Sequence, residues 1–305
     1  GINNSGQVVG VYSLSGQSYP GGPWHAYLWS QSAGLQDLGT LDGPSASSSA
    51  TAINNNGQVV GSTDSPDCPN GSPFLWTAPT GMQLTLGCTP VIPTSINDDG
   101  QTVGQVVDPS GTFFDVVLWS PTEGVQILGP GVQVPWWPGE PAISDNGQVV
   151  GTAYQPSDNG DLPFMWSSET GTQYLNNLVP RGVSINYAGS INQLGQIIAW
   201  GNRFSYLLTP KMYTTLTSSL NPSYAGQSVT FTGTVSSIAS PPPDGELVSF
   251  SEHGTPLGSA PLIGGVATFT TSSLPVGVLH IEATYVGDGT FEPSRPGKLK
   301  QVVKK

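Results

Sequence analysis

The sequence has few charged residues, few histidines and only two cysteines. Asp, Glu, Lys and Arg together make up 9% of the 305 residues, against roughly 25% in typical soluble domains. The chain contains no Gly-x-Gly-x-x-Gly run, no phosphate-binding loop, no His-Glu-x-x-His pair and no Gly-x-Ser-x-Gly elbow. These absences argue against nucleotide-dependent enzymes, zinc proteases and α/β-hydrolases. Three histidines and two cysteines also supply too few ligands for a zinc or redox-metal site.

Long apolar runs are missing as well. No stretch approaches the ~20 residues of a membrane-spanning helix, and no secretory signal is visible. The chain starts at Gly1 in the middle of a repeated motif, so we expect a mature product or a fragment of a longer protein. Cys68 and Cys88 lie in Gly/Pro-rich stretches of one repeat. We interpret them as a disulfide that staples this repeat, which implies an oxidising compartment.

Turn-forming residues are abundant. The chain has 40 Gly and 28 Pro together with 8 Trp, 10 Tyr and 9 Phe. Disordered chains lack aromatic residues, so this composition favours short strands joined by many turns over disorder. No window shows a helical period with caps. The sequence therefore predicts an all-β protein.

Negative charge is concentrated in the first part of the chain. Residues 1–210 hold 14 Asp and Glu against only Arg181 and Arg203, whereas residues 211–305 hold six charges of each sign. An acidic surface repels a phosphate backbone, so we expect no nucleic acid as a partner. The acidic part suits cations or neutral ligands, and solubility alone also accounts for it.

One unit is written five times between residues 2 and 209. Each copy begins with an Ile-Asn-x-x-Gly-Gln-Val-Val-Gly type motif, continues with a Tyr-Leu-Trp type motif, and in the first four copies ends with a Gly-Leu-Gln type element. The first motif predicts a tight hairpin loop with Gly at positive φ, and the others predict short strands. The shared tryptophans are expected in the core; they are Trp29, Trp76, Trp119 and Trp166.

A repeat of about 47 residues with three or four antiparallel strands matches the blade of a β-propeller. We therefore predict a β-propeller-like repeat domain over residues 1–210. About five blades are visible, and this count is a minimum. Closure of the ring stays open, because the fifth repeat lacks its last element and the first lacks what precedes Ile2.

The repeats resemble the HAF family of extracellular bacterial repeats. The resemblance rests on the Ile-Asn-x-x-Gly-Gln-Val-Val-Gly motif, on His25-Ala26-Tyr27-Leu28-Trp29 and on Asp37-Leu38-Gly39-Thr40-Leu41. It covers residues 1–210 and implies secretion or surface display, but no established reaction. The motif's His occurs only once here, at His25, so it cannot serve a catalytic role shared by the repeats.

Residues 211–305 change to strict alternation of apolar and polar residues, at the strand spacing of an Ig-like β-sandwich. This part resembles bacterial Ig-like domains, on Asn221-Pro222, Gly226-Gln227, Gly264-Gly265 and Gly287-Asp288-Gly289. Such modules act as spacers or adhesive units of secreted and surface proteins, which is what the resemblance implies here.

Candidate site residues lie where the repeats differ. Aromatic side chains on loops can stack on sugars or apolar ligands, although they equally can plug a propeller channel. The ligand-binding candidates are Trp24, Trp136, Trp137 and Glu140. Oxygen-rich loops suit a structural calcium ion, although Asx-turns explain them equally well. The calcium candidates are Asp64, Asp67, Asn70, Asp158 and Asp161.

We expect a secreted or surface-displayed, non-catalytic repeat protein for binding, adhesion or extracellular assembly, with the Ig-like domain as spacer. A glycan or a surface protein is the expected ligand, self-association is a second interpretation, and no membrane insertion is expected. The rival hypothesis is an extracellular carbohydrate-active enzyme, of glycoside hydrolase or lyase type, on the propeller face. Such chemistry needs paired carboxylates, and the candidates are Asp42, Asp115, Glu140 and Asp161.

Overall fold

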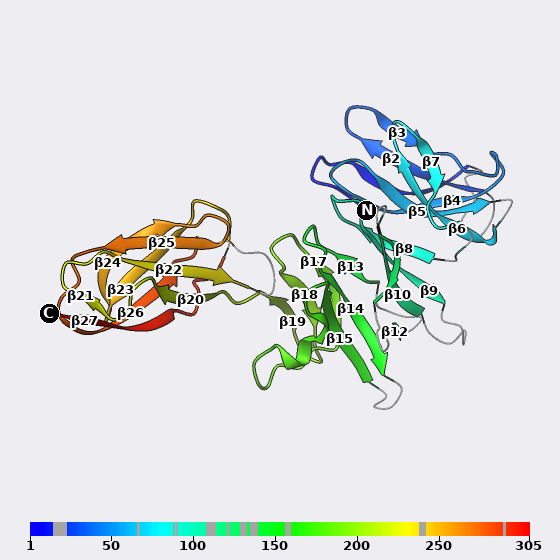
Figure 1. Cartoon of the computed structure of the whole chain (residues 1–305). Coiled ribbons are helices and arrows are strands. Elements are labelled where there is room, and N and C mark those ends of the chain that lie inside the picture. The colour runs from blue at the N-terminus through cyan, green and yellow to red at the C-terminus, as the bar shows by residue number, and fades with distance from the viewer. Residues whose placement is uncertain are drawn as a thin grey trace. The chain divides into compact units, whose positions relative to one another are not determined.

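The computed structural model describes most of the chain and shows an all-β protein (Figure 1). The described residues are 1–14, 23–65, 68–87, 89, 91–107, 114–120, 123–128, 133–134, 140–155, 160–237, 242–288 and 291–305. The chain divides into two compact units, Gly1–Leu208 and Thr209–Lys305. We call them the repeat unit and the Ig-like unit.

The described residues of the repeat unit form five small antiparallel sheets, one for each repeat. Sheet 1 contains β1 (Val8–Ser13), β2 (Trp24–Ser30) and β3 (Gly34–Asp37). Sheet 2 contains β4 (Ser48–Ile53), β5 (Val59–Ser65), β6 (Cys68–Thr77) and β7 (Gly81–Leu84). Sheet 3 contains β8 (Val91–Ile96), β9 (Thr102–Val107), β10 (Phe114–Ser120), β11 (Gly124–Ile127) and β12 (Gln133–Val134).

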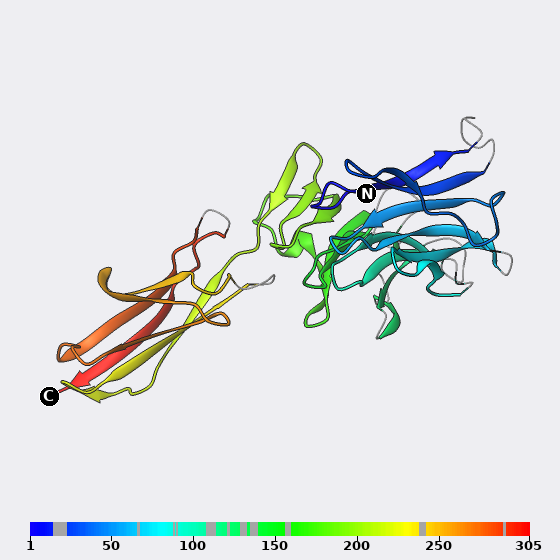
Figure 2. The same ribbon diagram turned by 90° about the horizontal axis from the view of Figure 1, so that it is seen from above.

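The last two sheets follow the same plan. Sheet 4 contains β13 (Ala142–Ile143), β14 (Val149–Gln155), β15 (Gly160–Ser167) and β16 (Gly171–Tyr174), followed by the 3-10 turn Leu175–Asn177. Sheet 5 contains β17 (Tyr187–Ile191), β18 (Ile197–Trp200) and β19 (Ser205–Leu208). In each sheet neighbouring strands in sequence pair with one another, except that β12 returns to β10. Figures 1 and 2 show the sheets following one another in chain order.

Each internal sheet is apolar on both faces because it packs between two neighbours. Side chains that alternate along a strand point to opposite faces. Leu28 of sheet 1 belongs to one buried cluster with Phe74 and Trp76 of sheet 2. Leu118 of sheet 3 likewise shares a cluster with Phe164 of sheet 4, and a third cluster joins sheets 4 and 5. The core is therefore a series of thin interfaces between sheets.

The shared tryptophans confirm this arrangement in part. Trp76 and Trp166 are buried, with 6% and 7% of their surface exposed, and Trp119 is half-buried. Trp29 is 40% exposed, so the prediction of a core position is wrong for this residue. In sheets 2 and 4 the equivalent Trp lies on the face that packs against the preceding sheet. No described residue forms a sheet that could cover this face of sheet 1.

Cys68 is buried in β6. The described part of the chain holds no free cysteine, and Cys88 lies outside the described residues. The Cys68–Cys88 disulfide stays a prediction.

The Ig-like unit is a sandwich of two sheets. One sheet has the order β20-β22-β25 and the other β21-β27-β26-β23-β24. The strands are β20 (Tyr213–Ser218), β21 (Ser223–Tyr224), β22 (Val229–Ser236), β23 (Leu247–Glu252), β24 (Thr255–Pro261), β25 (Val266–Thr271), β26 (Gly277–Tyr285) and β27 (Gly297–Lys304). Phe231, Phe250, Ile281 and Tyr285 are fully buried between the sheets. No helix among the described residues has the length and apolar character to cross a membrane.

Candidate functional site

The five x-x-x-Gly-Gln hairpin turns, four of which begin with Asn and the fourth with Ser144, converge on one place in the repeat unit. In the second repeat, Asn54 begins the turn and Gly57 takes φ 74°, the left-handed conformation that a residue without Cβ adopts at little cost. Gly57 N–H donates to Asn54 O at 3.1 Å and closes the turn. The predicted hairpin loop with Gly at positive φ is thus confirmed at this position.

The side chain of Asn54 uses its full hydrogen-bonding capacity. Its Oδ1 accepts from the backbone N–H of Asn56 at 3.1 Å and of Gln58 at 2.9 Å. Its Nδ2 donates to Gln58 Oε1 at 2.7 Å and to the carbonyl oxygen of Asn97 at 2.9 Å. An amide offers two donors and one oxygen with two lone pairs, so all four positions are taken. One of the four bonds reaches the next repeat.

The same bond recurs along the series and links the turns. Asn3 Nδ2 donates to Asn54 O at 3.0 Å, and Asn97 Nδ2 donates to Ser144 O at 3.1 Å. We call this series the amide relay. It ends at Ser144, because serine has no amide to extend it towards Asn192.

A second row of bonds runs beside the amide relay, one residue further along each turn. Asn55 N–H donates to Asp98 Oδ1 at 2.8 Å, and Asp98 N–H donates to Asp145 Oδ1 at 2.9 Å. At the last junction Asp145 Oδ2 accepts from Gln193 Nε2. Carboxylates at these positions therefore act as acceptors for a neighbouring turn, and charge-assisted bonds of this kind are stronger than neutral ones.

The five turns surround a cavity of about 520 Å³, which we call the axial cavity. Its lining combines the Ile that precedes each turn with the polar residues of the turn itself, namely Asn4, Asn55, Asp98, Asp145 and Gln193. Ligand pockets commonly have volumes of roughly 300–1,000 Å³ with a few placed polar groups. The axial cavity has this size and offers amides and carboxylates to a polar ligand.

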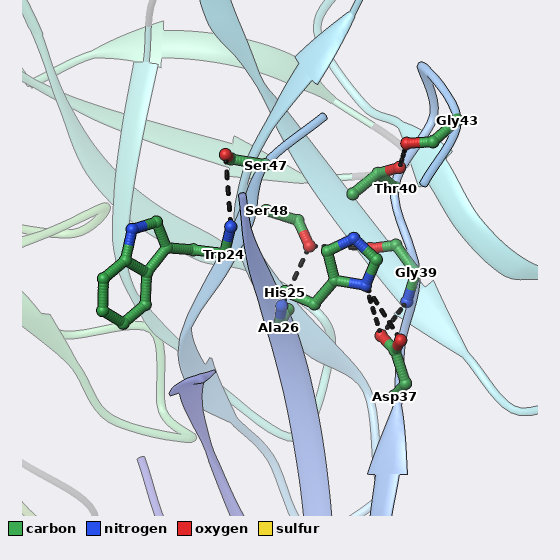
Figure 3. Close-up of polar contacts among 9 residues, drawn as sticks. All are labelled: Trp24, His25, Ala26, Asp37, Gly39, Thr40, Gly43, Ser47 and Ser48. Atoms are coloured by element: carbon green, nitrogen blue, oxygen red, sulfur yellow. Dashed lines mark hydrogen bonds and ion pairs between the residues drawn. The ribbon is translucent and has the colours of Figure 1, made fainter. Parts of the chain in front are cut away.

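His25 and Asp37 form a second polar cluster, on sheet 1 (Figure 3). His25 is buried, and its Nδ1 lies 2.8 Å from Asp37 Oδ2. Asp37 Oδ1 also accepts from Gly39 N–H at 2.8 Å. Ser48 Oγ accepts from Ala26 N–H at 2.9 Å and donates to Gly39 O at 2.6 Å. Ser48 is therefore engaged with the backbone and is not presented to His25 as a nucleophile.

The surroundings of this cluster shift two pKa values. Burial by itself raises the pKa of Asp37, but hydrogen bonds from Gly39 N–H, His25 and Tyr12 outweigh it, and the net shift is downwards. The pKa of Tyr12 is raised, first by burial and then by its hydrogen bond to the Asp37 carboxylate and that group's charge. Because hydrogen-bond donors keep the Asp37 carboxylate ionised, we interpret Asp37 as a structural anchor that joins β2 to the end of β3.

The described candidates from the sequence do not form one site. Trp24 is half-buried, and its backbone N–H donates to Ser47 Oγ at 3.4 Å. Its indole lies on the other side of β2 from His25 (Figure 3). Asp64 is exposed and accepts from Ser47 N–H at 2.8 Å. Glu140 is exposed. The pKa of Tyr187 is raised mainly by burial, and the negative charge of Glu140 adds to this shift. None of the three lines the axial cavity.

The remaining candidates lie where the structure gives no side-chain description. Trp136, Trp137, Asp67 and Asp158 fall outside the described residues, and Asn70 and Asp161 are described only as strand positions. Among the residues that are described, no three His, Cys, Asp or Glu side chains gather as a metal site. The calcium and Trp-loop hypotheses therefore stay predictions.

Sequence reasoning missed the axial cavity and the amide relay. The sequence shows Asn at the first position of four turns. A hairpin loop by itself explains this preference, so the sequence did not indicate a bond between turns. The bond to the next repeat depends on how two turns lie side by side.

Comparison with known proteins identifies the second unit. Residues 216–304 match the family of bacterial Ig-like domains (group 3), which confirms the predicted Ig-like sandwich. No curated protein matches the chain.

Solved structures show only remote likeness. The chain is similar to the extracellular domain of a hybrid two-component system from B. thetaiotaomicron, at 9% identity and TM-score 0.27, over 92% of this chain and 47% of that one. A second such domain from the same organism gives 11% identity and TM-score 0.30, over 95% and 43%. An exo-beta-1,3-galactanase from Phanerochaete chrysosporium is 13% identical, with TM-score 0.29, over 99% of this chain and 92% of that one. The chain thus spans less than half of the two bacterial structures.

Proposed function

We propose that this chain is a secreted or surface-displayed bacterial binding protein that takes a polar ligand of glycan type in its axial cavity. The observation that carries the proposal is the convergence of all five turns on one cavity of about 520 Å³. Amide and carboxylate groups there pair well with sugar hydroxyls, which both donate and accept. The Ig-like unit serves as the spacer.

The repeat unit is proposed to be a β-propeller-like array of HAF type. Five short meander sheets, each packed on the next, support this architecture, since propeller blades are small antiparallel sheets arranged around a central channel. The axial cavity then corresponds to the channel. The match of residues 216–304 to bacterial Ig-like domains supports the extracellular setting.

A carbohydrate-active enzyme is the second candidate, because two carboxylates, Asp98 and Asp145, line the same cavity. Glycosidases use such pairs as acid and base or nucleophile. Here, however, both oxygens of Asp98 accept hydrogen bonds from Asn55, and both oxygens of Asp145 accept from neighbouring turns. Carboxylates fixed by these bonds are poor candidates for a catalytic acid or nucleophile, whereas each oxygen keeps a second lone pair that can accept from a ligand hydroxyl.

A glycan array with a cavity-filling variant tests the proposal. Asn4 is exposed, and its N–H rather than its side chain bonds to Asn55 Oδ1, so Asn4→Trp fills the cavity and keeps that bond. Asn202→Trp, in the exposed turn after β18, is the matched control. We expect Asn4→Trp to lose binding and Asn202→Trp to keep it. No glycan binding by the wild type, or equal binding by both variants, contradicts the proposal.

Two further measurements separate the rival sites. If Trp136→Ala or Trp137→Ala abolishes binding while Asn4→Trp does not, the ligand binds the Trp loop instead of the axial cavity. Release of sugar from a polysaccharide panel, lost in Asp145→Asn, would replace the binding hypothesis with the enzyme.

A further inference from the structure

A second hollow opens between sheets 1 and 2 of the repeat unit, and we call it the junction groove. Its volume is about 360 Å³, which falls within the roughly 300–1,000 Å³ of common ligand pockets. Its residues come from β2 and β3, from β6, and from the turns before β1, before β5 and after β6. The groove lies at a packed junction, so both of its walls are sheets of this chain.

The base of the junction groove is apolar. Leu28 and Trp76 line it, and both belong to the buried cluster between sheets 1 and 2. Ala78 and Pro79, in the turn after β6, are exposed and add apolar surface. The carbon–hydrogen faces of a sugar ring are apolar as well, so they leave water when they pack on such a surface.

Gln36 lies beside this apolar base and offers a complete amide. It pairs across the strands with Leu28, and directly opposite residues of an antiparallel pair have their side chains on the same face. Gln36 is exposed, and its side chain bonds to no other residue in the described part of the chain. Both of its donors and its oxygen are therefore available to a ligand.

Gln7 and Asn56 each offer half of an amide, and the other half holds the side chain in place. Gln7 Oε1 accepts from Asn3 Nδ2 at 2.8 Å, and Asn56 Nδ2 donates to the carbonyl oxygen of Asp98 at 2.7 Å. Gln7 Nε2 and Asn56 Oδ1 have no partner among the described residues. A side chain that is fixed before binding loses little conformational entropy when a ligand arrives.

The junction groove differs from the axial cavity in charge. None of the described residues that line the groove is charged, whereas Asp98 and Asp145 line the axial cavity. An ionised ligand group would leave water in the groove without meeting an opposite charge. Hydroxyl groups both donate and accept, so they match the free amides. The groove therefore favours a neutral polyhydroxylated ligand.

Asn55 connects the two hollows, because it lines both of them. Its backbone N–H and Nδ2 donate to the Asp98 carboxylate at 2.8 and 2.9 Å, and its Oδ1 accepts from Asn4 N–H at 2.9 Å. The axial cavity and the junction groove thus lie on either side of one fixed side chain. A single sugar ring cannot fill both, whereas a chain of several rings can pass from one to the other.

We propose that the junction groove is a second binding site and that the ligand is a linear, uncharged oligosaccharide. One end of this oligosaccharide lies in the axial cavity, and the chain extends past Asn55 into the groove. The proposal rests on the glycan function proposed above, because the axial cavity holds the first part of the ligand. It adds that affinity rises with the length of the oligosaccharide until the groove is filled.

Isothermal titration calorimetry of the full chain with mono- to hexasaccharides of cellulose, xylan and laminarin tests the proposal. Ala78→Trp places an indole in the groove, and Gln36→Ala removes the free amide. Each should lower the affinity for the hexasaccharide about tenfold, equivalent to one or two hydrogen bonds, and leave the affinity for the disaccharide unchanged. Both side chains are exposed, so each variant should keep the wild-type circular dichroism.

Gln31→Trp is the matched control, at the equivalent position of the turn after β2. Gln31 is exposed and lines neither hollow, so this variant should bind the hexasaccharide as the wild type does. An affinity independent of length, or an unchanged affinity for the hexasaccharide in both Ala78→Trp and Gln36→Ala, overturns this proposal. Loss of binding in Asn4→Trp would then still support the axial cavity. If the wild type binds no saccharide of any length, the proposed function fails and the groove proposal fails with it.

Discussion

The repeat unit and the Ig-like unit are both built mainly of antiparallel strands, with the short β21 parallel to β27 in the Ig-like unit, but they are stabilised differently. The Ig-like unit buries Phe231, Phe250 and Ile281 in one core between two sheets. The repeat unit divides its apolar surface among interfaces between successive sheets and adds a row of hydrogen-bonded turns. Stability in such arrays is roughly a sum of neighbour terms, whereas a single core unfolds as a whole.

The largest expected effect comes from removing one buried ring in each unit. Phe164 and Phe250 are both fully buried, and Phe→Ala in a core costs about 3–5 kcal/mol. In calorimetry, Phe250→Ala should lower the melting temperature of the Ig-like unit only. Phe164→Ala should lower and broaden the transition of the repeat unit, because sheets away from its junction stay packed. A shift of both transitions in either variant would contradict the separation of the two units.

The amide relay gives a smaller effect that depends on position. Asn97 is buried and bonds both its own turn and Ser144 of the next repeat, so Asn97→Ala should cost about 2–3 kcal/mol. Asn192 is exposed and bonds only within its turn, so Asn192→Ala should cost about 1 kcal/mol. Urea unfolding measures both. Equal losses would show that the bond to the next turn adds nothing.

The Asp37 anchor should make the repeat unit, and not the Ig-like unit, sensitive to acid. The folded pKa of Asp37 is below the ordinary value of 3.8, so its contribution is complete above pH 3.8 and is lost as pH falls through the lowered pKa. The carboxylate is 40% exposed, which limits the contribution. At neutral pH Asp37→Asn should cost about 1 kcal/mol, and the difference from wild type should vanish in strong acid.

Asp42→Asn is the control for that measurement. Asp42 is exposed, and its replacement removes the same charge without the anchor. A loss of stability equal to that of Asp37→Asn would mean that net charge, and not the hydrogen bonds of Asp37, is responsible.

The smallest expected effect is a gain. Ser144 stands where the other four turns have Asn, and Ser144→Asn would offer an amide to Gln148 and to the turn at Asn192. We expect a rise of about 0.5–1 kcal/mol in the unfolding free energy of the repeat unit, with the Ig-like unit unchanged. A lower stability would mean that the space at this turn does not admit the larger side chain.

Features that depend on a few neighbouring residues could be predicted from the sequence. The hairpin turn at Asn54 to Gly57 and the Ig-like sandwich follow from turn chemistry and from alternation, which act within a few residues. Trp29 shows the limit of this reasoning. It occupies the same repeat position as Trp76, but burial at this position depends on a preceding sheet, and no described residue forms a sheet before sheet 1.

The candidate site was less accessible from the sequence for a related reason. The axial cavity is lined by turns that are about 50 residues apart in the chain, such as those of Asn4 and Asn55. Each residue looks like an ordinary turn residue by itself. Singling out residues that the repeats do not share directed attention to Trp24 and Asp64, whereas the cavity is formed largely by residues at shared positions.

Native-state hydrogen exchange of Asn97→Ala tests most directly whether the shared turn residues couple neighbouring sheets. The account predicts faster exchange of the amides of β9 in sheet 3 and β14 in sheet 4, which flank the lost bond, with sheet 1 and the Ig-like unit unchanged. Faster exchange confined to the turn of Asn97 itself, or spread evenly over all five sheets, would contradict it.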